Sequence, residues 1–512
     1  MELSSSPHVV KQDTPLYDIG KPDTAHVEQQ VDIHGLVVDR RHEQELLAAK
    51  LEGEDKKIKR IIRRLDIRLV LMLALLYVWA FIDRGNLANA NIAGMSKDLK
   101  LTGNNRYSVL TMIFFVGYVL VDVPSTFLVR KIGATLMIPT IVVAWGIVSI
   151  AQGFCHTWGP LLVCRVLLGI FEGGLIPSSM FLISLWYTRY EAHTRLAAFY
   201  VIGIASTGVS GLLAYGIEKM DGDSGLAGWR WIFILAREGV VTCFCGIVAY
   251  FVLVDLPERA TQKSFVGMPP LLTAEEASLV HARIERDRGD STAEKLTWKA
   301  MLHHAKDWKV WEFSSYVLLN NTALYAFAYF LPVILQKSLG YSTSKAQLFT
   351  FPPYAVAVPW IMFCAWICDK LRVRGPVLIF NCTLYIIGVT ITGFSENPHA
   401  RYGGVFIGVM GITGNIPTNW AYQHNNVVGQ GKRAFCSAMM TTGGGLGGII
   451  AGNIFQAKDG PGYRPALTIC LAFQALNILL VVKNFVYFTW ANRKADREEL
   501  IIEGKPGFRY TY

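Results

Sequence analysis

The stretch LVLMLALLYVWAFIDRGNLANANIA, residues 69–93, begins with 14 apolar positions in succession. A bilayer core about 30 Å thick takes roughly 20 helical residues at 1.5 Å each, so this stretch predicts a transmembrane helix. Eleven further apolar runs of comparable length follow it, at 107–129, 134–154, 161–187, 196–217, 239–256, 312–336, 346–368, 376–394, 402–424, 435–455 and 466–490. The sequence therefore predicts an all-α membrane protein with twelve transmembrane helices.

A polar segment, residues 258–311, separates the first six apolar runs from the last six. Seven basic residues lie between positions 56 and 68, before the first run, and Arg493, Lys494 and Arg497 follow the last. Because cytoplasmic flanks carry an excess of Lys and Arg, both termini are expected in the cytoplasm. The predicted organisation is a cytoplasmic tail (1–66), an N-terminal six-helix bundle (67–257), a cytoplasmic linker (258–311), a C-terminal six-helix bundle (312–490) and a cytoplasmic tail (491–512).

The composition argues against several other classes of protein. Hydrophobic residues make up 52% of the chain and charged residues 17%, whereas a soluble domain carries about 25% charged residues. The net charge of +10 comes from Lys and Arg scattered between apolar runs, which argues against nucleic-acid binding. The nine cysteines indicate neither a disulfide framework nor a metal site. We expect no enzyme, no catalytic residue and no cofactor, because no nucleophile with its base and no metal-ligand set is recognisable.

Four charged residues lie deep inside the predicted spans: Asp83 and Arg84 in the first, Arg165 and Glu172 in the fourth. Each costs at least about 2.5 to 3.5 kcal/mol on insertion, so such residues usually face a cavity and carry function. Arg165 and Glu172 share a helix face, but about 10.5 Å separates them along the axis. This distance is too long for an ion pair, so each needs a partner on another helix or on a substrate.

A guanidinium keeps its charge when buried and binds carboxylates through two hydrogen bonds. Arg84 and Arg165 are therefore the candidates for holding an anionic substrate. Glu172, followed by Asp83, is the candidate for proton coupling, because an anion that engages the arginine leaves the carboxylate less supported and easier to protonate. The alternative is structural: Asp83 and Glu172 would neutralise the arginines and fix the packing of the helices.

The seventh apolar run contributes a polar face. Asn321, Tyr325 and Tyr329 are spaced four residues apart, so they lie on one side of the predicted helix. Amide and phenol groups there could bind polar or ring-shaped parts of a substrate. Hydrogen bonding to neighbouring helices is the equally weighted alternative.

The sequence GGGLGG, residues 443–448, matches the dinucleotide fingerprint G-x-G-x-x-G by letters alone. It follows no strand and lies within a run of bilayer length, so the βαβ context that the fingerprint requires is missing. These glycines instead predict close packing of helices or a hinge.

Several motifs resemble one known family. They are Asp83-Arg84-Gly85-Asn86, then Phe114-Phe115-x-x-Tyr118, and Arg165-x3-Gly169-x2-Glu172-Gly173-x3-Pro177. Over residues 66–495 the chain resembles the major facilitator superfamily, in particular the fungal anion:cation symporter branch that includes allantoate, nicotinate and pantothenate permeases. The resemblance implies two six-helix bundles around one central site, rocking between two access states, usually with proton coupling. It also assigns functional roles to Arg84, Arg165 and Glu172.

The superfamily loop signature G-x-x-x-D-[KR] has a counterpart at Ala365-x3-Asp369-Lys370, with alanine in place of the usual glycine. By this resemblance Asp369, Lys370, Arg372 and Arg374 form a gating loop. A second departure is the pair Ala236-Arg237, which the family usually lacks. Two extra residues rotate a helix by about 200°, so they either loop out before the sixth span or reflect an error in the gene model.

The sequence therefore predicts a secondary active transporter that carries a small organic anion by proton-coupled symport. The expected substrate is a carboxylate such as a vitamin or a nitrogen-source acid. Its partners are this anion, protons and the lipid bilayer, and we expect a functional monomer in the plasma membrane. The alternative is an efflux transporter for an acidic secondary metabolite, which would use the same scaffold in the opposite direction.

Overall fold

The computed structural model describes residues 51, 53–101, 105–218, 220–222, 225–234, 239–262, 267, 269–288, 302–337, 339–455, 459, 463–504 and 508–512. Within these ranges the regular structure is entirely helical, which confirms the predicted all-α class. Among the described residues, eleven helical segments are long and apolar enough to cross a membrane. The expected tail up to residue 50 and the Ala236-Arg237 pair lie outside the described residues.

The N-terminal bundle starts with a long helical rod over residues 55–98 that is kinked at Gly94, where φ is 111°. Neither Pro nor Gly interrupts the sequence between Asp55 and Arg84. The rod comprises α3 (Asp55–Leu65), η1 (Asp66–Val70), α4 (Leu71–Ala90), η2 (Asn91–Met95) and α5 (Ser96–Asp98). The bundle continues with α6 (Arg106–Ile132), α7 (Ala134–Gly153), α8 (Trp158–Gly173), α9 (Leu175–Trp186), α10 (Arg189–Glu218), α11 (Gly228–Ile234) and α12 (Gly239–Val252).

The predicted fourth span is divided at Gly174 into α8 and α9. Pro177 lies in the first turn of α9 and has no N–H to donate to the carbonyl four residues earlier, so the helix is interrupted here. The two pieces still form one membrane-crossing segment, Trp158–Ile183.

The C-terminal bundle contains α15 (Trp308–Lys337), α16 (Thr343–Leu348), α17 (Phe351–Leu371), α18 (Gly375–Phe394), α19 (Pro398–Asn426), α20 (Gln430–Ile454) and α21 (Arg464–Asp496). The predicted run 402–424 lies within α19, which has 29 residues but is not among the eleven sufficiently apolar helices. Its polar side chains, such as Asn415 and Asn419, are buried inside the protein instead of facing lipid. In the described part of the chain, the number of helices apolar enough to cross a membrane is therefore eleven, one fewer than the number of predicted runs.

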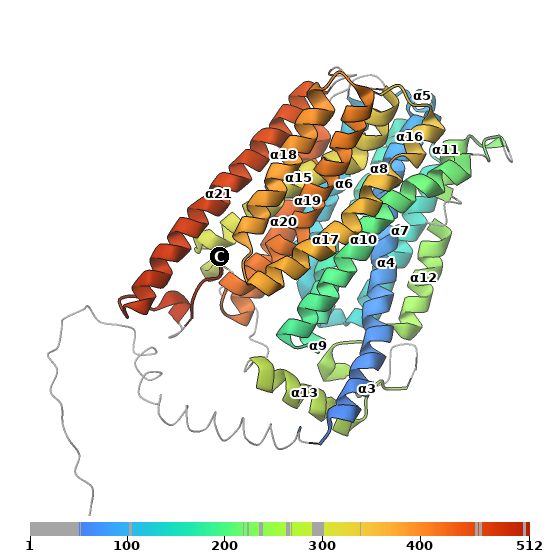
Figure 1. Ribbon diagram of the computed structural model, residues 1–512. Helices are drawn as coiled ribbons and strands as arrows, with labels where there is room; N and C mark the ends of the chain where they lie inside the picture. The colour runs from blue at the N-terminus through green and yellow to red at the C-terminus, as the bar shows by residue number, and fades with distance from the viewer. Residues whose placement is uncertain are drawn as a thin grey trace, which may run out of the picture.

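The long helices of the two bundles run side by side (Figure 1). Helix α3 and the linker helix α13 (Ala274–Arg288) lie at one end of the molecule, which we call the α3 end. Ion pairs join α13 to the N-terminal bundle: Lys57 with Glu275 at 2.6 Å, Arg64 with Glu276, and Arg283 with Glu191. The described part of the linker thus packs against the first bundle.

Glycines allow the bundles to approach closely along α6 and α20. A Cβ atom at Gly448 would lie 2.4 Å from the ring of Phe115, and one at Gly445 would lie 2.6 Å from Val119. On the other side of α20, a Cβ at Gly447 would meet the backbone of α15 at 2.6 Å. The residues 443–448 therefore serve close helix packing, as the sequence predicted.

Candidate functional site

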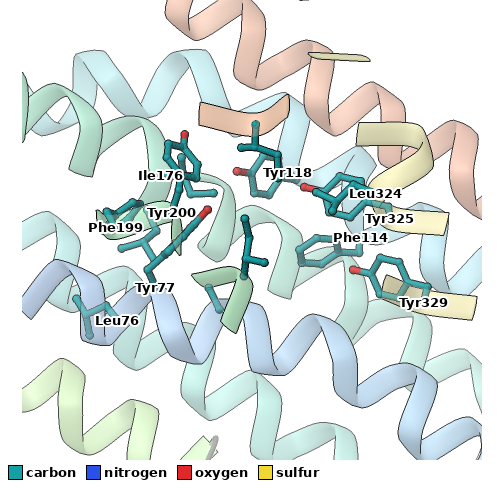
Figure 2. Close-up of a cluster of buried hydrophobic side chains, with 14 of the residues drawn as sticks. Leu76, Tyr77, Phe114, Tyr118, Ile176, Phe199, Tyr200, Leu324, Tyr325 and Tyr329 are labelled. Atoms are coloured by element: carbon teal, nitrogen blue, oxygen red, sulfur yellow. The ribbon is translucent and has the colours of Figure 1, made fainter. Parts of the chain in front are cut away.

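A cavity of about 50 Å³ lies between the two bundles. Its walls come from α4, α6, α9, α10, α15, α19 and α20, so closing it requires both halves of the chain. Six of the eighteen lining residues are aromatic, and Figure 2 shows three of them, Tyr77, Tyr118 and Tyr325, gathered from three different helices. An apolar, aromatic cavity with a few polar groups is the usual form of a small-molecule site.

Arg84 is the charged residue in the wall of this cavity. It is 3% exposed, and its Nη1 group donates a hydrogen bond to the Tyr325 hydroxyl at 2.9 Å. Its guanidinium carbon lies 5.4 Å from the centre of the Tyr118 ring and 5.2 Å from that of Phe81. The aromatic faces add favourable electrostatic contact, since a ring carries negative potential on its face. The structure thus places one fixed positive charge beside the cavity.

Glu172 neutralises this charge. The Arg84 Nε group donates to Glu172 Oε1 at 2.7 Å, and Nη2 lies 2.6 Å from the same oxygen. Glu172 is fully buried, and its second oxygen, Oε2, has no hydrogen-bond partner among the described residues. In the described contacts, the Glu172 carboxylate therefore binds Arg84 through Oε1 alone. Glu172 is too far from Arg165 along the helix to pair with it and was expected to need a partner elsewhere. That partner is Arg84 of α4.

Arg165 lies elsewhere on α8 and does not line the cavity. It is 1% exposed, and its guanidinium carbon lies 5.9 Å from the centre of the Phe233 ring. Its Nε and Nη2 groups have no hydrogen-bond partner among the described residues. Buried donors are normally satisfied, so this guanidinium stands out as a second potential anion holder. In this structure, however, only Arg84 lines the cavity, and Arg165 does not.

Asp83 points away from the cavity, although it neighbours Arg84 in sequence. Its Oδ2 atom accepts hydrogen bonds from Trp145 Nε1 at 3.1 Å and from Ser149 Oγ at 3.4 Å, both on α7. The structure therefore places Asp83 within the N-terminal bundle, where it links α4 to α7.

Helix α15 brings two of its three predicted residues to the cavity. Asn321 and Tyr325 line it, whereas Tyr329 lies one turn further along. The Tyr329 ring packs edge-on against Phe115 with centres 6.1 Å apart, and its carbonyl accepts a hydrogen bond from the Tyr107 hydroxyl at 3.1 Å. Tyr329 thus supports the contact between the bundles beside the cavity.

The cavity is covered on both sides by contacts between the bundles. Toward the α3 end, Tyr200 of α10 stacks on Trp420 of α19 with ring centres 6.2 Å apart and planes 25° apart. At the opposite end, Ser108 donates a hydrogen bond to the Phe455 carbonyl at 2.9 Å. Both contacts join the N-terminal bundle to the C-terminal bundle.

A sequence-family model described as the Major Facilitator Superfamily matches residues 73–452. The chain belongs to this superfamily. This MFS transporter is 31% identical over 446 residues to the high-affinity nicotinic acid transporter of Saccharomyces cerevisiae, covering 87% of this chain and 80% of that protein. It is also 31% identical over 438 residues to the MFS-type transporter efuF of Hormonema carpetanum, covering 85% and 86% of the two chains.

Solved structures agree with the fold. The D-xylose-proton symporter has a TM-score of 0.60 at 11% identity, covering 81% of this chain and 96% of that chain. A bacterial homolog of the human lysosomal transporter Spinster, inward-facing and occupied, has a TM-score of 0.58 at 15% identity, covering 84% and 98%. At these identities the likeness concerns the fold alone. The protein is thus a multi-pass secondary transporter of the major facilitator fold, and its relatives are transporters, not enzymes.

The predicted gating loop of this MFS transporter connects α17 to α18. Arg374 Nη2 donates to Asp369 Oδ1 at 2.6 Å, Lys370 lies 4.7 Å from the centre of the Trp366 ring, and Arg372 adopts a left-handed backbone with φ of 53°. These contacts are internal to the C-terminal bundle. The four loop residues lie between α17 and α18 at the α3 end, and none of them lines the cavity.

Sequence reasoning missed part of the lining of this MFS transporter. Asn419 and Trp420 of α19 face the cavity, and the Asn419 Oδ1 atom has no hydrogen-bond partner among the described residues. Tyr77 and Tyr200 were not singled out either. The polar residues of the tenth run, 402–424, could have indicated Asn419 and Trp420. A helix surrounded by lipid rarely carries so many polar side chains.

Proposed function

We propose that this protein is a proton-coupled symporter of a small organic anion, a carboxylate of the size of a vitamin or nitrogen-source acid. The observation that carries the proposal is the buried Arg84–Glu172 pair at the cavity wall. A guanidinium engaged through one carboxylate oxygen keeps donors that a substrate carboxylate can use. The nicotinic acid transporter among the relatives supports the anionic substrate class.

Coupling follows from competition for Arg84. A substrate carboxylate that binds the guanidinium withdraws it from Glu172, which is fully buried. An unpaired carboxylate in a dry interior is costly, so Glu172 takes up a proton when the substrate arrives. Anion and proton then bind with positive coupling, and by linkage each raises the affinity for the other. In this scheme Asp83 remains the second candidate for the proton.

The rest of the lining would select the shape of the substrate. The rings of Tyr118, Tyr325 and Trp420 offer flat apolar surfaces, while Asn320, Asn321 and Asn419 offer amide groups. A small aromatic or planar acid would match this combination better than a flexible aliphatic acid. Arg165 would serve as a second anion holder, and the loop of Asp369, Lys370, Arg372 and Arg374 would gate the α3 end.

The proposal is tested by uptake into proteoliposomes with an imposed pH gradient, acidic outside. Nicotinate and a panel of other small carboxylates are the probes, and their neutral amides are matched controls. We expect accumulation of at least one acid that collapses when a protonophore is added, and none of its amide. Accumulation that ignores the gradient, or preference for the amides, would contradict proton-coupled anion symport. Accumulation only with the gradient reversed would favour the efflux alternative.

We further propose that the α3 end faces the cytoplasm, in the plasma membrane. The exposed Lys56, Arg60 and Arg63 of α3 precede the first span, and the positive-inside rule then places this end inside. Single cysteines at Lys59 and Glu498, introduced into a cysteine-free variant, should react with an impermeant maleimide only after the cells are permeabilised. Labelling of either position in intact cells would reverse the proposed topology.

A further inference from the structure

After α21 the chain turns back, and residues 508–512 lie against the α3 end of the C-terminal bundle, where Figure 1 marks the C-terminus. Tyr510 is only 5% exposed. Its ring stacks on Phe488 of α21 with centres 4.3 Å apart and planes 19° apart. This segment was expected to be a tail, yet it is packed like part of the core.

Two asparagines hold the backbone of the segment. Asn492 of α21 donates to the Tyr510 carbonyl at 2.9 Å and accepts from the Tyr510 N–H at 2.8 Å. Asn426, the last residue of α19, makes the same pair of bonds with Thr511, at 3.0 and 2.8 Å. Each amide side chain thus satisfies both backbone groups of one residue, which is how an extended peptide is held in a recognition groove.

Charged groups add specificity around Tyr510. Lys309 at the start of α15 donates to the Tyr510 hydroxyl at 2.8 Å and pairs with Glu503. Lys432 at the start of α20 pairs with Glu503 at 2.6 Å and also with Asp307. Burial disfavours the charge of Asp307, but the bonds from Lys432 and Lys309 outweigh it and keep the pKa of Asp307 below its ordinary value.

The segment also reaches the predicted gating loop. The backbone N–H of Arg374, directly before α18, donates to the backbone oxygen of Tyr512 at 2.5 Å. The Arg374 side chain in turn binds Asp369. Docking of the segment and the geometry of this loop are therefore linked through one residue.

We infer that the α3 end of the C-terminal bundle is a groove for an extended aromatic peptide, and that residues 508–512 occupy it reversibly as a clamp. The bound clamp contacts the ends of α15, α19 and α21 and Arg374 directly before α18, and it reaches Lys432 of α20 through Glu503, so the bundle moves as one body. When the clamp leaves, these helix ends and the Arg374 loop lose their common anchor. This inference does not depend on the nature of the substrate.

Trypsin cleavage after Arg509 in the full-length protein measures release of the clamp, because the scissile bond precedes the Tyr510 N–H that Asn492 holds. We expect slow cleavage in the unaltered protein. Combined Asn426→Ala and Asn492→Ala substitutions should increase the rate at least tenfold. Ile501→Ala, at a position 62% exposed, is the control and should leave the rate unchanged. Equal rates in the unaltered and doubly substituted proteins would overturn the inference.

A binding measurement gives a second test that leaves the groove itself intact. Full-length Tyr510→Ala should vacate the groove, so a fluorescent peptide of sequence GFRYTY, residues 507–512, should bind it at least ten times more tightly than it binds the unaltered protein. A peptide with the same residues in scrambled order should bind neither. If the peptide binds both proteins equally, or the scrambled peptide binds as well, no such groove exists.

Discussion

Glu172→Gln is expected to abolish accumulation of substrate driven by a pH gradient while preserving exchange of substrate across the membrane. Glutamine resembles the protonated glutamate in shape and charge, so the variant mimics the state that the substrate-bound carrier is proposed to adopt. Arg84 then has no competing carboxylate and remains open to an anion. One proton per substrate at a gradient of one pH unit supports about tenfold accumulation. The variant should reach a ratio of about 1.

The measurement compares counterflow with gradient-driven uptake in the same proteoliposomes. Glu312→Gln is the matched control, because Glu312 is also a buried glutamate paired with a cation, Lys483 at 2.7 Å, but lies outside the cavity. The control should retain accumulation. If Glu172→Gln still accumulates substrate in response to pH, the proton binds elsewhere, and Asp83 is the next residue to substitute.

Arg84→Lys is expected to weaken apparent substrate affinity by about 10- to 100-fold while the protein still folds and inserts. Lysine preserves the charge that Glu172 needs but cannot present two parallel N–H groups to a carboxylate. Loss of one hydrogen bond to a charged group costs about 1.5 to 3 kcal/mol, which corresponds to this range of affinity. Concentration dependence of uptake gives the value.

Substitutions of Arg165 and Arg106 provide a second candidate and a control for this test. Arg165→Lys should also weaken affinity if Arg165 holds the anion during part of the cycle. Arg106→Lys is the control, since Arg106 contacts Trp158 and the Lys100 carbonyl outside the cavity. Unchanged affinity in both Arg84→Lys and Arg165→Lys would mean that the arginines only stabilise the helix packing.

The fold was largely predictable because length and apolarity are local properties of the sequence. Residues 69–93 correspond to the membrane-spanning part of a continuous helix, and most other runs correspond to one helix or one interrupted helix. Helix α19 also contains its predicted run, 402–424, but it falls below the hydropathy of the other eleven helices. A helix whose polar side chains face a protein interior need not be apolar, so hydropathy alone underestimates it.

The site was predicted in part. Helix periodicity places Arg165 and Glu172 on one face, but it contains no information about which residue on another helix meets them. For that reason the sequence could not decide whether Arg84 pairs with a substrate or with Glu172. The structure shows the pairing with Glu172. The contribution of Trp420 could not be derived either, because it depends on how α19 packs against α10 across the interface between the bundles.

The Arg84–Glu172 pair also bears on how the transporter responds to membrane voltage. In the empty carrier the guanidinium and the carboxylate sum to zero charge. In the proposed loaded carrier, the guanidinium faces a monovalent anion and Glu172 is neutral, so the sum is again zero. Moving one unpaired charge through 100 mV would involve about 2.3 kcal/mol. A pair that is neutral in both states avoids this contribution, and the membrane potential neither drives nor opposes the movement of this site in either direction.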